Sequence, residues 1–167
     1  KVEEQYSGSI GGSLGYGAYG FSLGANYSEK NAFGTGNTVS VGISYSEWRQ
    51  DISFNFFDPY FTIDGLGLGY GAYLRKTDYG NFNIASYNTD SYGGSVNFQL
   101  PITEIEQLGL SLQVDNTQLK ANVFSSRQLV DFYTSEGFDF NTYSGQVSWS
   151  RVTLDRGLFP TNGSRNS

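Results

Sequence analysis

Hydrophobic and polar residues alternate one by one along most of the chain. In one run Val39, Val41 and Ile43 alternate with Ser40 and Gly42. Seven further runs behave in the same way, so that the full set is 9–16, 21–27, 38–45, 51–56, 65–74, 91–100, 108–114 and 143–149. A period of two sends successive side chains to opposite faces of a β-strand, whereas a helix would repeat every 3.6 residues. We therefore predict an all-β, antiparallel protein.

The connections between these runs differ at the two ends of the predicted sheet. Turn-forming residues fill 30–36, 58–65 and 154–163. The intervening connections are tight links at 17–20 and 47–50 and longer polar loops at 76–90 and 116–141. Successive connections of an antiparallel sheet fall on opposite ends. One end is thus expected to carry compact turns and the other two long loops, as in outer-membrane barrels.

Composition helps to decide what surrounds the sheet. The 167 residues have a mean hydropathy of −0.38 and 38% hydrophobic residues, which alone would suggest a soluble protein. However, strands with strictly alternating hydrophobic and polar residues also have a low mean hydropathy. In addition, only 16% of the residues are charged, against about 25% in average proteins. Gly, Ser, Thr and Asn on the polar face suit a water-filled lumen, and the 13 Tyr and 13 Phe suit interfacial girdles. A transmembrane β-barrel is favoured, with a secreted β-sandwich or solenoid as the other possibility.

Missing residue types remove several kinds of chemistry. The chain contains no His and no Cys, which excludes a serine triad, a histidine-built zinc site and a thiol nucleophile. A net charge of −6 disfavours binding to nucleic acid. We therefore expect no enzyme activity, no cofactor and no metal. Asp155 and Arg156 are interpreted as an ion pair of a turn rather than as an acid–base pair.

Several turns are specific enough to suggest a family. They are Ser7-Gly8-Ser9 with Gly15-Tyr16-Gly17, Gly34-Thr35-Gly36, Asp58-Pro59-Tyr60-Phe61 with Asp64-Gly65, and Leu154-Asp155-Arg156-Gly157 with Pro160. In their order and spacing the chain resembles the first half of the transmembrane barrel in the BamA family of outer-membrane assembly factors. That resemblance implies a barrel of sixteen strands in the bacterial outer membrane. Residues 1–167 would form a partial barrel domain with strands one to eight and the start of the ninth near 163–167. Periplasmic POTRA domains would precede Lys1, and the second half of the barrel would follow Ser167.

The resemblance also implies a physical mechanism. In the family the first strand opens a lateral seam and accepts the terminal strand of a client barrel. Here the main chain of that strand would be the pairing site, namely Ser7, Gly8, Ser9, Ile10, Gly11, Gly12, Ser13, Leu14 and Gly15. Its many glycines make a weak ladder plausible, although they could also serve only to bend the barrel. The structural periplasmic turns would comprise Asp58, Pro59, Tyr60, Phe61, Asp155, Arg156, Gly157 and Pro160.

Partners and alternatives follow from the same interpretation. The expected partners are the lipid bilayer, client β-barrel proteins, accessory lipoproteins of an assembly complex, and the missing half of the barrel or another chain to cover the open edges. One alternative is a two-partner-secretion or autotransporter-assembly barrel of the same superfamily. Another is a self-contained eight-stranded barrel with binding loops, which requires 6–17 to be hydrogen-bonded to 142–152. An outer-membrane hydrolase is the weakest alternative because the chain has no His.

Overall fold

The computed structural model describes residues 7–17, 20–79, 87–121, 138–153 and 164–166. Every regular element within them is a β-strand. The strands are β1 (Gly8–Gly17), β2 (Gly20–Ala32), β3 (Asn37–Ser46), β4 (Arg49–Asp58), β5 (Gly67–Asp78), β6 (Tyr87–Thr103), β7 (Glu106–Ala121), β8 (Asp139–Val152) and β9 (Arg165–Asn166).

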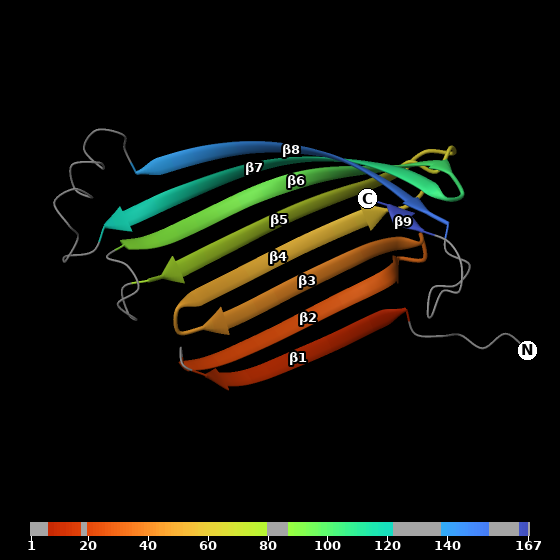
Figure 1. Cartoon of the computed structure of the whole chain (residues 1–167). Coiled ribbons are helices and arrows are strands. Elements are labelled where there is room, and N and C mark those ends of the chain that lie inside the picture. The colour runs from red at the N-terminus through yellow and green to blue at the C-terminus, as the bar shows by residue number, and fades with distance from the viewer. Residues whose placement is uncertain (1–6, 18–19, 80–86, 122–137, 154–163, 167) are drawn as a thin grey trace, which may run out of the picture.

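All nine strands belong to one curved antiparallel sheet, in which they lie in the order of the sequence (Figure 1). The predicted all-β, antiparallel fold is therefore confirmed. The turns after β2, β4 and β6 lie at one end of the sheet, and the last residues of β1, β3, β5 and β7 lie at the other. We call these the turn end and the loop end.

The register carries the alternation of the sequence across the whole sheet. Directly paired residues project to the same face. One row across the first eight strands is mainly hydrophobic: Ile10, Tyr27, Val41, Phe54, Ala72, Gly94, Val114 and Tyr143. The adjacent row is mainly small or polar: Gly11, Asn26, Gly42, Ser53, Tyr73, Gly93, Asp115 and Thr142. We call the first face the outer face and the second the lumen face.

The sheet is a single layer without an apolar core. Among the described residues, Ala32 and Leu68 are the only hydrophobic side chains that are buried. Large outer-face side chains in the middle of the sheet stay exposed, for example Ile43 at 53% and Ile52 at 49%. A soluble sandwich would cover such a face with a second sheet. Here the two faces are suited to two solvents, lipid outside and water inside.

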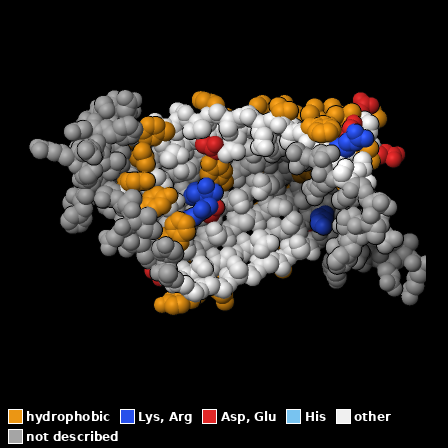
Figure 2. All heavy atoms as spheres, in the orientation of Figure 1, with side chains coloured by type: hydrophobic (Ala, Val, Ile, Leu, Met, Phe, Trp, Pro, Cys, Tyr) orange, Lys and Arg blue, Asp and Glu red, His pale blue; other side chains and the backbone are white. Residues whose placement is uncertain are grey.

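The space-filling view shows the lumen face (Figure 2). Its middle is mostly white, meaning small and uncharged polar groups, and hydrophobic side chains project mainly at the margins. A compact group of charged side chains lies toward the loop end. On the outer face, the apolar positions of β6 run from Tyr92 to Leu100, a length of about 27 Å at 3.4 Å per residue. That length suits the apolar band of a tilted membrane strand. In the described part of the chain, no helix is long and apolar enough to cross a membrane.

The strands at the loop end are longer than the sequence pattern predicts. The predicted loop 76–90 loses residues to both neighbours, because β5 continues to Asp78 and β6 begins at Tyr87. Likewise β7 continues to Ala121 and β8 begins at Asp139, inside the predicted loop 116–141. Backbone pairing continues here although the apolar alternation has stopped, since both faces of a strand are wet once it leaves the lipid. Periodicity marked the membrane-facing part of each strand rather than its end.

The two edges of the sheet decide one of the alternatives. Strand β8 pairs with β7 and, through Arg151 and Val152, with β9. Strand β1 lies at the opposite edge and pairs with β2. A self-contained eight-stranded barrel requires β1 to pair with β8, so this alternative is wrong for the described residues. The start of a ninth strand lies within the predicted range 163–167.

Candidate functional site

The candidate site is the outer edge of β1, the first strand of the sheet. Of the nine predicted pairing residues, Ser7 lies just before β1 and the other eight lie within it. The pairing of β1 with β2 runs without a bulge from Gly8–Glu29 to Gly17–Gly20. Within the described residues no strand pairs with the other side of β1. Its backbone N–H and C=O groups on that side therefore form a free edge.

The side chains of β1 show the same lack of a neighbour. Ile10, Leu14 and Tyr16 on its outer face are 87%, 74% and 88% exposed. The corresponding outer-face residues of interior strands are about half exposed, such as Ile43 at 53%. The difference between these exposed fractions corresponds to the side-chain surface that a strand paired with the open side of β1 would cover.

Glycine weakens the packing between β1 and β2. Five of the ten residues of β1 are glycine. Each glycine in a strand interior costs about 0.5–1 kcal/mol relative to alanine, so the three interior glycines, Gly11, Gly12 and Gly15, weaken the strand by about 1.5–3 kcal/mol. Side chains of β2 cover some of them: Glu29 lies over Gly8, Asn26 over Gly11 and Ser22 over Gly15. The ladder is thus held mainly by its backbone.

A different arrangement stabilises the lumen face of β4, β5 and β7. Asp51 on β4 accepts hydrogen bonds from Arg49 at 3.2 Å and from Nε of Arg75 on β5 at 3.2 Å. Arg75 also lies over the ring of Tyr73, 5.0 Å from its centroid. The Tyr73 hydroxyl donates to Asp115 on β7, across β6. Because these groups are partly shielded from water, their hydrogen bonds are stronger than exposed ones.

The network is completed by Gln113, whose amide donates to both oxygens of Asp115 at 3.0 and 2.9 Å. Tyr73 can reach Asp115 because the β6 residue between them is Gly93, which has no side chain. We call Arg49, Asp51, Tyr73, Arg75, Gln113 and Asp115 the lumen network. Periodicity alone did not single these residues out as a group. The sequence indicates only that each of these residues occupies a polar position of an alternating run. Which of them are in contact follows from the register of the strands.

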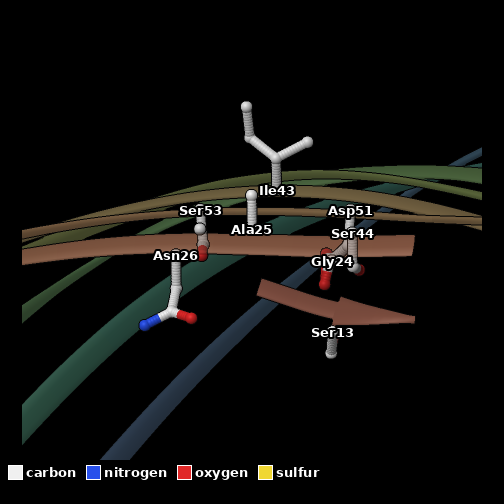
Figure 3. Close-up of a pocket in the computed structure, with 9 residues that line it drawn as sticks. Ser13, Gly24, Ala25, Asn26, Ile43, Ser44, Asp51 and Ser53 are labelled. Atoms are coloured by element: carbon white, nitrogen blue, oxygen red, sulfur yellow. The ribbon is translucent and has the colours of Figure 1, made fainter. Parts of the chain in front are cut away.

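Beside the network the lumen face is hollowed (Figure 3). The hollow has a volume of about 260 Å³. Ser13 and Asn26 point to one side of the sheet, whereas Ala25 and Ile43 point to the other. Its polar lining comes from Ser13, Asn26, Ser44, Asp51 and Ser53. Such a surface holds water and polar groups and offers no apolar pocket.

The predicted turn residues are placed at the turn end as far as they are described. Asp58 ends β4, and its carboxylate accepts a hydrogen bond from the backbone N–H of Tyr60 at 2.9 Å. This Asx-type contact orders the turn. Tyr60 and Phe61 are exposed at 79% and 55%. The other predicted turn residues, Asp155, Arg156, Gly157 and Pro160, lie outside the described residues.

Carboxylates of the loop end do not gather into a cation site. Asp90 accepts a hydrogen bond from Lys120 at 2.5 Å, and Asp115 is part of the lumen network. Among the described residues no three His, Cys, Asp or Glu side chains lie close enough to hold a metal ion.

Comparison with known proteins identifies the family. A model of the Omp85 superfamily domain matches residues 31–167. The chain belongs to the Omp85 superfamily. It is 30% identical over 173 residues to the outer membrane protein assembly factor BamA of Neisseria meningitidis, covering 97% of this chain and 22% of that protein. It is 27% identical over 164 residues to the BamA of Nitratidesulfovibrio vulgaris, covering 98% of this chain and 20% of that protein.

The fold agrees with a solved structure of the same family. The crystal structure of BamA from Haemophilus ducreyi lacking POTRA domains 1–3 aligns with a TM-score of 0.66 and 25% sequence identity. The alignment covers 98% of this chain and 33% of that chain. The predicted likeness to a BamA barrel is therefore confirmed, and the sheet belongs to a barrel of the bacterial outer membrane. The chain spans about a fifth of the length of the curated relatives that it matches.

Proposed function

We propose that the chain is part of an insertase barrel, which folds outer-membrane proteins by pairing the free edge of β1 with the terminal strand of a client. The observation that carries the proposal is that half of the residues of β1 are glycine, so that its ladder with β2 is held mainly by the backbone. The relatives' role as assembly factors supports it.

Physical chemistry favours capture of a strand at this edge. Each unsatisfied backbone group costs several kcal/mol in hydrocarbon, where no water is present to pair with it. A strand that adds to the edge satisfies these groups through its main chain, without needing a particular sequence. That suits a protein that must accept many clients. The glycines of β1 keep the existing ladder weak enough to exchange one partner for another.

The process needs no bond to be made or broken. We propose that the barrel acts without enzyme chemistry and without a cofactor. Its partners are the bilayer against the outer face, the client strand at β1, accessory lipoproteins of an assembly complex, and the second half of the barrel that closes the sheet. The lumen face holds water and polar groups.

Cysteine crosslinking in the outer membrane tests the proposal. Single cysteines replace Ser9, Ser13 and Gly15 in the full-length protein, and the last strand of a client carries a cysteine at successive positions. We expect crosslinks at all three sites in one register, so that moving two residues along β1 moves the partner by two. Ser44→Cys on the interior strand β3 is the control and should not crosslink, because both sides of β3 are paired. If no position of β1 crosslinks above Ser44→Cys, the proposal fails.

A further inference from the structure

A hollow lies on the outer face at the turn end of β2. It has a volume of about 350 Å³. Tyr27, Ala32 and Val39 line it with apolar groups, and Glu29 adds a carboxylate. Strand β2 is paired with β1 on one side and with β3 on the other. The groups that argue for a site therefore belong to interior strands and their turn, and not to an edge of the sheet.

Glu29 lies where the outer face of β2 passes from hydrocarbon to headgroups. The outer-face positions before it are all apolar, namely Phe21, Leu23, Ala25 and Tyr27. Glu29 follows Tyr27 by two residues, which is about 7 Å along a strand. Short turns of outer-membrane barrels face the periplasm, so the turn end belongs in the periplasmic leaflet. The carboxylate is thus expected at the level of the phospholipid headgroups of that leaflet.

The hydrogen-bond partners of Glu29 are uncharged groups. Its carboxylate accepts hydrogen bonds from the backbone N–H of Asn31 at 3.1 Å and from the Tyr27 hydroxyl at 3.4 Å. The ion pairs between described residues do not include Glu29, and no Lys or Arg lines the hollow. A carboxylate can accept about four hydrogen bonds. Glu29 can therefore accept further hydrogen bonds from a cation in the hollow.

A second carboxylate on the outer face at the turn end provides a contrast. Glu106 on β7 is paired with Arg151 on β8, and their side chains form an ion pair at 3.7 Å. The sheet thus supplies a cation to Glu106, whereas within the described residues it supplies none to Glu29. This difference indicates that a cation for Glu29 comes from outside the sheet, and it makes Glu106 a matched control.

Phe33 lines the same hollow in an unfavourable backbone conformation. Its φ is 57°, and among the described residues no other side chain except the hydrogen of glycine occurs at positive φ. Glycine would fit this conformation better, yet the position holds a large apolar side chain that is 100% exposed. Strained residues of this kind cluster at functional sites. At the level of the headgroups, an aromatic ring can lie against the cation of a lipid.

We propose that Glu29, Tyr27 and Phe33 bind the headgroup of a phospholipid that carries a primary amine, such as phosphatidylethanolamine. The ammonium group donates charge-assisted hydrogen bonds to Glu29, and the Phe33 ring lies against the cation. The upper part of an acyl chain packs on Ala32 and Val39. A choline headgroup has the same positive charge but no N–H to donate, so it is held less tightly. The site rests on the position of the turn end in the membrane and does not rest on strand capture.

Photolabelling in lipid nanodiscs tests the site with the full-length protein. The nanodiscs contain phosphatidylethanolamine and phosphatidylcholine in equal amounts, with a trace of one or the other carrying a diazirine near the glycerol. Mass spectrometry measures the label on residues 27–39 relative to the label on residues 100–108, which also lie at the turn end. We expect the ethanolamine lipid to label 27–39 about fivefold more than the choline lipid, as one net hydrogen bond would produce.

Three substitutions separate the site from general contact with lipid. Glu29→Gln removes the charge at nearly constant shape and should abolish the preference for the ethanolamine lipid. Glu106→Gln removes a carboxylate that is already paired with Arg151 and should leave the preference unchanged. Phe33→Gly removes the ring and relieves the positive φ. It should therefore lower the preference while raising the urea concentration at which the protein unfolds, so that a loss of binding cannot come from a loss of folding.

Each outcome decides for or against the site. A preference that is lost with Glu29→Gln, reduced with Phe33→Gly and kept with Glu106→Gln supports it. Equal labelling of 27–39 by the two lipids overturns it, because the hollow would then hold acyl chains without reading the headgroup. No labelling of 27–39 by either lipid also overturns it, since protein would then cover the hollow. A preference that survives Glu29→Gln or Phe33→Gly unchanged contradicts the site as defined. Strand capture at β1 is tested separately by the cysteine crosslinks.

Discussion

Two adjacent glycines of β6 give a sharp test of how the sheet is packed. Gly93 faces the lumen and Gly94 faces outward. Both have backbone φ values that other residues adopt, since positive φ within the described chain occurs elsewhere. Replacing each in turn by alanine therefore changes the local space and not the backbone strain. We expect Gly93→Ala to be strongly destabilising and Gly94→Ala to be neutral or stabilising.

The magnitudes follow from what the new methyl group meets. At Gly93 it would lie 2.8 Å from Cε1 of Tyr73 and 2.8 Å from the carbonyl oxygen of Val114. Relieving this overpacking costs about 1–3 kcal/mol. Displacing Tyr73 from Asp115 loses a hydrogen bond to a charged group, about 1.5–3 kcal/mol. Alanine also lowers the conformational entropy of the unfolded chain, which stabilises the folded protein by about 0.4–1 kcal/mol. The net loss of unfolding free energy is about 1.5–5.5 kcal/mol.

At Gly94 the nearest atom is the carbonyl oxygen of Gly71 at 3.5 Å, an ordinary contact. Gly94→Ala should therefore gain up to about 1 kcal/mol from the unfolded state. The assay is urea unfolding of the full-length protein in lipid vesicles, followed by tryptophan fluorescence, with both variants compared at the same lipid composition. If both variants shift the midpoint equally, or if Gly93→Ala is as stable as the parent, the contacts around Tyr73 and Asp115 do not stabilise the sheet as described.

Three further changes test other parts of the sheet in the same unfolding assay. Asp51→Asn removes the shared partner of two arginines and should lower the free energy of unfolding by about 1.5–3 kcal/mol. Asp90→Asn breaks a more exposed pair with one lysine and should cost at most about 1 kcal/mol. Equal losses for the two variants would contradict the role of the lumen network. Ile43→Lys puts a charge on the outer face and should cost about 2–4 kcal/mol near the middle of the bilayer. Ser44→Lys puts its charge on the lumen face, beside the polar hollow, and should cost much less. The reverse order would mean that the two faces are misassigned. Gly36→Ala forces a side chain into positive φ, at 78°, and should lower stability by about 1–2 kcal/mol; an unchanged midpoint would show that the turn adapts.

The sequence predicts the fold well because alternation is imposed by the surroundings of each strand. Lipid on one face and water on the other require a period of two. Seven of the eight predicted runs lie within a strand of the structure, and the run 65–74 begins two residues before β5. The same reasoning explains where it fails. Asn88, Thr89 and Asp90 pair with β5 although nothing in their hydrophobicity indicates a strand. Beyond the lipid, pairing depends on the backbone of the neighbour, which a hydrophobic pattern does not record.

The site is predicted less completely than the fold. The glycine-rich first strand is visible in the sequence, and the family resemblance assigns it the pairing role. That it forms a free edge depends on the order of the strands, which the structure provides. The contact of Tyr73 with Asp115 joins residues 42 positions apart across a glycine, and it depends on the register of three strands at once. No local pattern in the sequence contains that information.

The two sides of the sheet differ in how their strands are held together, and this difference bears on where a seam can open. Between β4 and β7, charged and aromatic side chains add to the backbone ladder through the lumen network. Between β1 and β3 the described side-chain hydrogen bonds on the lumen face are those of short hydroxyls, such as Ser28 with Ser40 at 2.9 Å and Ser9 with the carbonyl of Ser28 at 3.4 Å. Hydrogen bonds between short hydroxyl side chains hold neighbouring strands together less firmly than an ion pair between two strands does. If a client strand pairs with β1 as proposed, the deformation of the sheet should concentrate in β1 to β3, while β4 to β7 keep their register.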